Sequence, residues 1–97
     1  MAALSFVQDG KRWLSNVFQP TSSNIEICVR FLKPGGGLVG VLRSVDGVEF
    51  TSDNSGTEGN LGQKTKMIIF NVSGIVPGAF LRLASSSEPD SGCVWRE

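Results

Sequence analysis

The chain has 97 residues, and its nine Lys and Arg residues balance nine Asp and Glu residues, so its formal net charge is zero. Because nucleic acids and acidic membranes select basic surfaces, we expect neither as a partner. Histidine is absent, which removes the commonest general base and the commonest metal ligand, and two cysteines cannot complete a four-thiolate zinc site. We therefore expect one domain, residues 1–97, without a metal or cofactor.

The sequence predicts no transmembrane segment and no signal peptide. No run of 18 apolar residues occurs, and the apolar stretch at the N-terminus reaches Asp9 too soon for a signal sequence. Cys28 falls on the strand face that carries Glu26 and Arg30, far in sequence from Cys93. We expect two reduced, separate thiols, although the sequence leaves a disulfide between them open.

The first element expected is a hairpin centred on Asp9–Gly10, a dipeptide typical of type I′ turns. This register places Phe6 opposite Trp13, so two aromatic rings stack across the strands. Residues 13–18 could instead form a helical turn. A proline at position 20 ends the segment in either case.

Residues 24–32 form the clearest predicted strand, because apolar and polar side chains alternate along it. The apolar face consists of Ile25, Ile27, Val29 and Phe31. The glycine-rich segment 33–37 then breaks the chain, and residues 38–45 resume as a strand. A second two-residue turn at Asp46–Gly47 pairs Arg43 with Phe50.

The C-terminal half contains two strands that are apolar on both faces, residues 66–72 and 79–84. The polar, glycine-rich segment 51–63 reads as a long exposed loop, and residues 93–95 read as a short last strand. We expect segments 33–37, 51–63 and 85–91 to face outward as loops.

Seven or eight short strands with turns between them indicate an all-β fold. No strand alternates with a long helix, which argues against a parallel α/β sheet. The predicted fold is a single antiparallel β-sandwich with jelly-roll-like topology.

The two strands that are apolar on both faces need cover on both sides. A second copy of the chain could supply it, since obligate homo-oligomer interfaces are apolar, but so could a central position within the sandwich. The residues that an interface would use are Met67, Ile69, Phe80, Leu81 and Leu83.

Four residues are candidates for ligand binding: Trp13, Arg43, Arg82 and Trp95. The arginines lie in apolar strands and could bind a sugar or a carboxylate, although a structural ion pair or a subunit interface explains them as well. The tryptophans could stack on a sugar ring, although tryptophan in a small β domain is more often part of a core or interface. Asp46 and Glu49 could serve glycoside hydrolysis, but the turn accounts for Asp46 and solvent exposure accounts for Glu49.

The segment Arg43-Ser44-Val45-Asp46-Gly47-Val48-Glu49-Phe50-Thr51, with the later Gly78-Ala79-Phe80-Leu81-Arg82-Leu83, resembles a motif pair of small jelly-roll modules. Discoidin-type and galactose-binding-like domains carry such a pair, and bacteriophage fibre and capsid-decoration proteins reuse similar pieces. The chain is shorter than discoidin domains and has no cysteine near its N-terminus. Its short, histidine-free sequence is more similar to a virion component.

We therefore expect a non-catalytic structural protein rather than an enzyme, because no nucleophile–base pair can be assembled without histidine. The first hypothesis is an oligomeric virion surface protein of the decoration or fibre kind, located on a virion or outside the cell. Its partners are further copies of itself and, in second place, other virion proteins or a surface glycan. The alternative is a carbohydrate-binding module.

Overall fold

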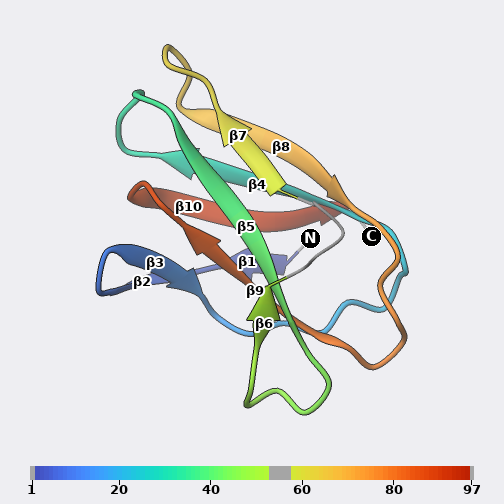
Figure 1. The fold of residues 1–97 in the computed structure, drawn as a ribbon. Coiled ribbons are helices and arrows are strands. Elements are labelled where there is room, and N and C mark those ends of the chain that lie inside the picture. The colour runs from blue at the N-terminus through green and yellow to red at the C-terminus, as the bar shows by residue number, and fades with distance from the viewer. Residues whose placement is uncertain (1, 53–57, 97) are drawn as a thin grey trace.

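The computed structural model describes residues 2–52 and 58–96, and the chain there folds as two antiparallel β-sheets packed face to face (Figure 1). Within these ranges no helix forms. The strands are β1 (Ala2–Leu4), β2 (Phe6–Asp9), β3 (Arg12–Ser15), β4 (Ile25–Phe31), β5 (Gly37–Ser44), β6 (Thr51–Ser52), β7 (Glu58–Leu61), β8 (Met67–Val72), β9 (Phe80–Ser85) and β10 (Pro89–Arg96). None of the described residues belongs to a helix that could cross a membrane.

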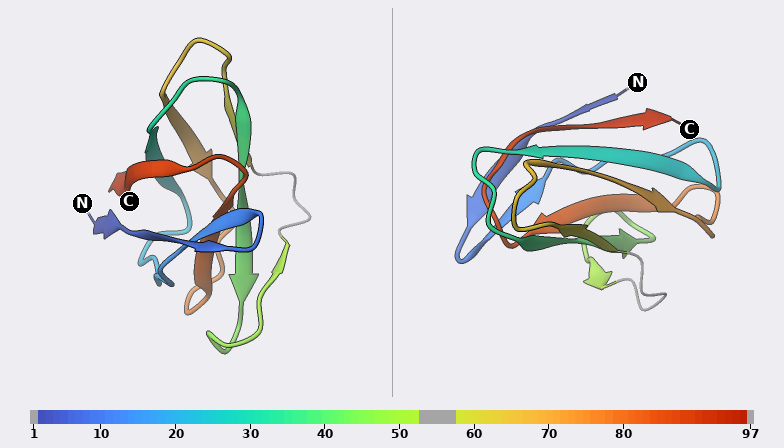
Figure 2. Two further views of the ribbon diagram at one scale, coloured as in Figure 1. Left: turned by 90° about the vertical axis from the view of Figure 1, so that its left-hand side faces the viewer. Right: turned by 90° about the horizontal axis from the view of Figure 1, so that it is seen from above.

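The order of the strands is that of a jelly roll. The first sheet has the order β1-β10-β4-β8, and the second has the order β2-β3-β9-β5, with β6 and β7 both paired to β5. If β2 and β3 are counted as one strand, and β6 and β7 as another, eight strands remain. Numbered 1 to 8 in chain order, these strands are arranged 1-8-3-6 in the first sheet and 2-7-4-5 in the second, which is the jelly-roll order. The first and last strands therefore lie side by side (Figure 2). The predicted all-β, jelly-roll-like sandwich is confirmed.

The hydrophobic core fills the space between the two sheets. β4 supplies its centre, and the predicted alternation is confirmed, since Ile25, Ile27, Val29 and Phe31 are at most 2% exposed. Burying four such side chains supplies about 1.5–3 kcal/mol each. The buried apolar side chains of both sheets are Leu4, Ile25, Ile27, Val29, Phe31, Val39, Val41, Leu61, Ile68, Val72, Ile75, Leu81, Leu83 and Val94.

The first hairpin forms, but its register differs from the predicted one. Asp9 pairs with Arg12, and Phe6 pairs with Ser15 rather than with Trp13. Gly10 is the first central residue of the turn and has φ +65°. Glycine at this position is typical of a type II′ turn, which shifts the pairing relative to a type I′ turn centred on Asp9–Gly10. The alternative helical turn over residues 13–18 does not form.

The second hairpin is wider than predicted. Arg43 pairs with Thr51 rather than with Phe50, so residues 45–50 form a loop. The loop is held by the side chains of Ser44 and Asp46, which accept backbone N–H groups from within it. Such bonds from short polar side chains compete with a tight two-residue turn.

The segment 51–63 is not one exposed loop. β6 and β7 pair with β5 at either end of this segment, and residues 53–57 lie outside the described residues. Leu61 is 5% exposed and belongs to the core. The loop prediction is therefore wrong at Leu61, because β5 provides a pairing edge that composition alone does not show. Segment 85–91 likewise includes the start of β10 at Pro89.

The structure corrects the interpretation of the strand that contains Leu81 and Leu83. β9 is central in the second sheet, between β3 and β5. Both leucines are fully buried in the core, so they are not available as an interface between copies. Phe80 lies against Gly47, and the chain's own β5–β6 loop thus covers part of its ring. The first sheet, and not a partner, covers the inner face of β9.

Candidate functional site

The four predicted ligand-binding residues do not gather at one place. Trp13 and Arg82 belong to the second sheet, whereas Trp95 belongs to the first. Arg43 and Arg82 are on opposite faces of the second sheet, because Arg82 pairs with the residue that precedes Arg43. No single ligand contacts all four, and a sugar site built from them together is excluded by their placement.

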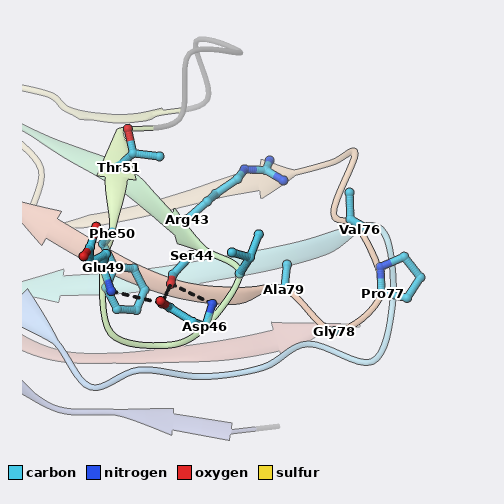
Figure 3. Close-up of a pocket in the computed structure, with 11 residues that line it drawn as sticks. Arg43, Ser44, Asp46, Glu49, Phe50, Thr51, Val76, Pro77, Gly78 and Ala79 are labelled. Carbon is cyan, nitrogen blue, oxygen red and sulfur yellow. Dashed lines mark hydrogen bonds between the residues drawn. The ribbon is translucent and has the colours of Figure 1, made fainter.

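A groove of about 570 Å³ lies at one end of the sandwich, between the β5–β6 loop and the connection from β8 to β9 (Figure 3). Two of its lining residues are exposed valines, Val45 at 94% and Val76 at 67%. The lining residues are Arg43, Ser44, Val45, Asp46, Glu49, Phe50, Thr51, Val76, Pro77, Gly78 and Ala79. This size is typical of ligand pockets.

Arg43 fixes one wall of the groove to the other. Its Nη1 donates a hydrogen bond to the carbonyl oxygen of Gly74 at 3.1 Å, and its Nη2 donates to that of Ser73 at 3.1 Å. Figure 3 shows the side chain extending toward the segment that carries Val76. Because guanidinium nitrogens in this fork hold backbone carbonyls, Arg43 acts here as a clamp between the two sheets.

The carboxylate of Asp46 holds the conformation of the β5–β6 loop. Its Oδ1 accepts the N–H of Val48 at 2.8 Å, the N–H of Glu49 at 3.1 Å and the hydroxyl of Ser44 at 2.8 Å. These bonds, that from Val48 first, hold the pKa of Asp46 below its ordinary value. A carboxyl that is ionised and bound in this way is unsuited to act as a general acid, which weakens the glycoside-hydrolysis alternative.

The groove therefore presents mainly carbon to an incoming group. The guanidinium of Arg43 and the carboxylate of Asp46 are engaged within the chain, while Phe50, Val76 and Pro77 contribute apolar surface. Glu49 is exposed near the rim. Chemically, the arrangement suits an apolar surface better than a charged group.

Arg82 and Ser15 form a second structural contact. The Nε of Arg82 donates to the carbonyl oxygen of Ser15 at 2.7 Å. Ser15 lies where β3 ends its pairing with β9. Arg82 thus satisfies a carbonyl that strand pairing no longer reaches, so its role is structural, although through a backbone carbonyl rather than the ion pair expected from the sequence.

The two tryptophans occupy separate surfaces. Trp13 is half-buried and pairs with Gln8 on one side and Ser85 on the other. Trp95 is 37% exposed, and the guanidinium carbon of Arg96 lies 4.7 Å from its ring centroid. This cation–π contact covers part of the surface that a stacked sugar would need.

β8 lies at an edge of the first sheet, and within the described ranges only β4 pairs with it. Its outward side chains include Met67, which is 43% exposed, and Ile69, which is 51% exposed. Ile69 continues a row across the outer face of the sheet through Cys28, Cys93 and Ala3, which are successive cross-strand partners. Two of the five predicted interface residues are therefore on the surface together.

Sequence reasoning missed the groove and the pairing of the two cysteines. The groove's lining residues Val45 and Val76 are apolar residues in loops, a signal that was available in the sequence. The cysteine pair had no local signal, because β4 and β10 are distant in sequence and meet only through the jelly-roll topology. No family model, curated protein or solved structure matches the chain.

Proposed function

We propose that this chain is a non-catalytic assembly protein that forms homo-oligomers and serves as a decoration or fibre component of a virion surface. The observation that carries the assembly part is the edge strand β8, with Met67 and Ile69 exposed on it. Jelly rolls are common in viral capsid domains, and the resemblance to bacteriophage decoration modules supports the virion assignment. A fold alone does not assign function, and the exposed edge of β8 supplies the specific support for assembly.

Within its own residues, β8 lacks three of the features by which proteins protect sheet edges. Residues 67–72 contain no charged residue and no proline, and their pairing with β4 has no bulge. An apolar edge of this kind offers unpaired N–H and C=O groups to another strand. A second copy presents the same edge, so two β8 strands can pair about a two-fold axis and join the first sheets of two copies.

The outer face reinforces this arrangement. A copy docked at β8 would cover Ile69 and Met67, whose side chains project beside the edge. Arg30, the cross-strand partner of Met67, donates from Nη2 to the Met67 sulfur at 3.8 Å and marks the polar border of the apolar row. An apolar centre with a charged border is the usual anatomy of a protein interface.

The test is the solution mass of the purified chain, measured by light scattering over a dilution series. We expect a stable oligomer that Ile69→Asp converts to monomer. Val7→Asp is the matched control, because Val7 is 62% exposed on β2, at the edge of the other sheet. A wild-type chain that is monomeric at every concentration, or an Ile69→Asp variant with unchanged mass and circular dichroism, refutes assembly through β8.

The groove supports carbohydrate binding as a second candidate function. Phe50 and the exposed Glu49 flank a groove of about 570 Å³, and jelly rolls also occur among lectins. The test is a glycan array followed by titration of any binding sugar into the wild-type chain and Phe50→Ala. We expect at least one sugar on the array to bind the wild-type chain and to bind Phe50→Ala more weakly; an array without signal refutes this candidate.

A further inference from the structure

Cys28 and Cys93 are direct cross-strand partners in the β4–β10 pair. Both are free thiols, both are half-buried, and both lie on the outer face of the first sheet, away from the core. No bond joins the two sulfurs in this structure, and the expectation that the thiols are separate is wrong, because they are neighbours. Neither the groove nor the edge of β8 uses them.

The backbone spacing of this pair suits a disulfide. Directly opposed residues of antiparallel strands have Cα atoms about 4.5–5.5 Å apart, and disulfides span Cα distances of about 4.4–6.8 Å. The Cβ atoms of such pairs are about 4.5–5.5 Å apart, whereas a disulfide requires about 3.5–4.5 Å. Closing the bond therefore needs an approach of at most about 1 Å.

β10 is irregular on both sides of Cys93, which permits this approach. Its pairing with β4 shifts register between Pro89 and Ser91 and again between Val94 and Arg96. Bulges of this kind interrupt the ladder and let a strand bend locally. Cys93 thus sits in a short stretch of β10 that can move toward β4 while the ladder beyond the bulges is kept.

The surroundings of Cys28 agree with close contact between the sulfurs. Burial raises the pKa of Cys28 most, the neighbouring Cys93 raises it further, and Arg30 opposes both effects. A hydrogen bond between the two thiols adds to the increase. Cys28 is accordingly protonated at neutral pH, and its exchange with disulfides starts from a minor thiolate population.

We propose that Cys28 and Cys93 form a reversible modification site that a low-molecular-weight disulfide, such as oxidised glutathione, converts to an intramolecular cross-strand disulfide. One cysteine thiolate attacks the oxidant, forms a mixed disulfide and releases one glutathione thiolate. The second cysteine thiolate then attacks the protein sulfur of that mixed disulfide and releases the second glutathione. The protein loses two electrons and two protons, and the oxidant gains both as two thiols.

The bond would fasten β10 to β4 at the middle of the first sheet. β1 is held in this sheet through β10, so both terminal strands become tied to the strand at the centre of the core. The loop that the bond closes is long, which favours a large loss of freedom in the unfolded chain. This inference does not depend on the proposed function.

The experiment treats the reduced chain with oxidised glutathione and follows intact mass, thiol alkylation and thermal unfolding. We expect the mass to fall by two hydrogen atoms, both alkylation sites to disappear, and the midpoint to rise on the order of 10 °C. Dithiothreitol should reverse all three changes. Non-reducing electrophoresis should show no covalent dimer, so that the changes in mass, alkylation and unfolding midpoint come from an internal disulfide.

Matched variants separate ring closure from simple thiol oxidation. Cys28→Ser and Cys93→Ser should each stop at a single glutathione adduct with no rise in the unfolding midpoint. The double variant should not react, and its circular dichroism reports whether the fold is kept. Stable adducts on both cysteines of the wild-type chain, or covalent dimers in place of the internal bond, would overturn the proposal.

Discussion

Ser15 accepts the backbone N–H of Leu83 through its side-chain Oγ, at a distance of 2.9 Å. The same hydroxyl donates to the carbonyl oxygen of Asn16 at 2.8 Å. Ser15 is fully buried at the point where β3 ends its pairing with β9. A side chain thus replaces a backbone acceptor at this break, and β9 regains a backbone partner at Phe18, which exchanges hydrogen bonds with Leu81.

Replacing Ser15 by Ala should leave the Leu83 N–H buried without its acceptor. We expect the free energy of unfolding to fall by about 1–3 kcal/mol, measured by urea denaturation. Ser91→Ala is the control, because Ser91 is exposed on the outer face of β10, and it should change stability by about 0.5 kcal/mol or less. Equal effects of the two variants would show that the Ser15 hydroxyl is not needed to satisfy Leu83.

The elements that could be predicted from sequence are those whose local pattern agrees with their final surroundings. β4 alternates strictly between buried and outward side chains, so its face, and its bounds to within one residue, follow from the period of a strand. Its outward residue Cys28 was placed correctly for the same reason. The sandwich follows from the number of such short segments and the turns between them.

The elements that could not be predicted depend on contacts between distant parts of the chain. β7 has only Leu61 as a large apolar residue, and β5 provides the edge that makes it a strand. The register of a hairpin depends on the type of turn that forms. At Asp46, the side-chain oxygen accepts backbone N–H groups and favours a wide loop over a two-residue turn. The groove and the Cys28–Cys93 pair exist only because the topology brings separate strands and loops together.

Arg43→Met should destabilise the end of the sandwich near the groove. The variant keeps most of the side-chain volume but loses both donors to the Ser73 and Gly74 carbonyls. We expect a loss of about 1.5–3 kcal/mol, the range for hydrogen bonds from charged groups, in chemical denaturation. Arg43→Lys should recover part of this loss, since it restores a single donor group.

Arg12→Met provides the control for loss of a cation. Arg12 is exposed, and its Nη2 lies 3.9 Å from the Asp9 carboxylate, so the variant should cost about 0–1 kcal/mol. If Arg43→Met costs no more than Arg12→Met, the Arg43 clamp does not stabilise the fold.

Asp46 should make the β5–β6 loop sensitive to acid. Its folded-state pKa is lowered from 3.8, chiefly by the N–H of Val48, then by that of Glu49 and by the Ser44 hydroxyl. The folded chain therefore binds this proton less readily than the unfolded chain. The stabilisation is fully present above the unfolded pKa and is lost as the pH falls through the folded pKa.

The measurement is amide hydrogen exchange of Val48 and Glu49 together with the unfolding midpoint, across the acid range on both sides of 3.8. Asp46→Asn is the matched variant, because its side-chain oxygen still accepts both N–H groups but does not titrate there. We expect the exchange protection of the Val48 and Glu49 amides to fall in the wild-type chain as the pH drops below 3.8. In Asp46→Asn, the protection of the same amides should stay level. Identical profiles would assign the acid sensitivity to other carboxyl groups.

Gly37→Ala should be poorly tolerated at the start of β5. Gly37 has φ +145°, in the region that favours glycine, and a Cβ atom there would collide with the Ser87 Oγ. That hydroxyl donates to the Gly36 carbonyl oxygen at 2.9 Å, so moving it would break a contact between two loops. We expect a loss of about 1–3 kcal/mol from the backbone strain alone, measured by urea denaturation.

Gly40→Ala on the same strand is the control. A Cβ atom there meets only the Ala84 carbonyl oxygen at 4.0 Å, and Gly40 does not have a positive φ. Since alanine also reduces the freedom of the unfolded chain, this variant should be neutral or more stable by about 0.4–1 kcal/mol. Opposite signs at positions 37 and 40 would show that backbone conformation and the Ser87 contact set the requirement for glycine. A Gly37→Ala chain as stable as Gly40→Ala would refute the requirement for glycine at position 37.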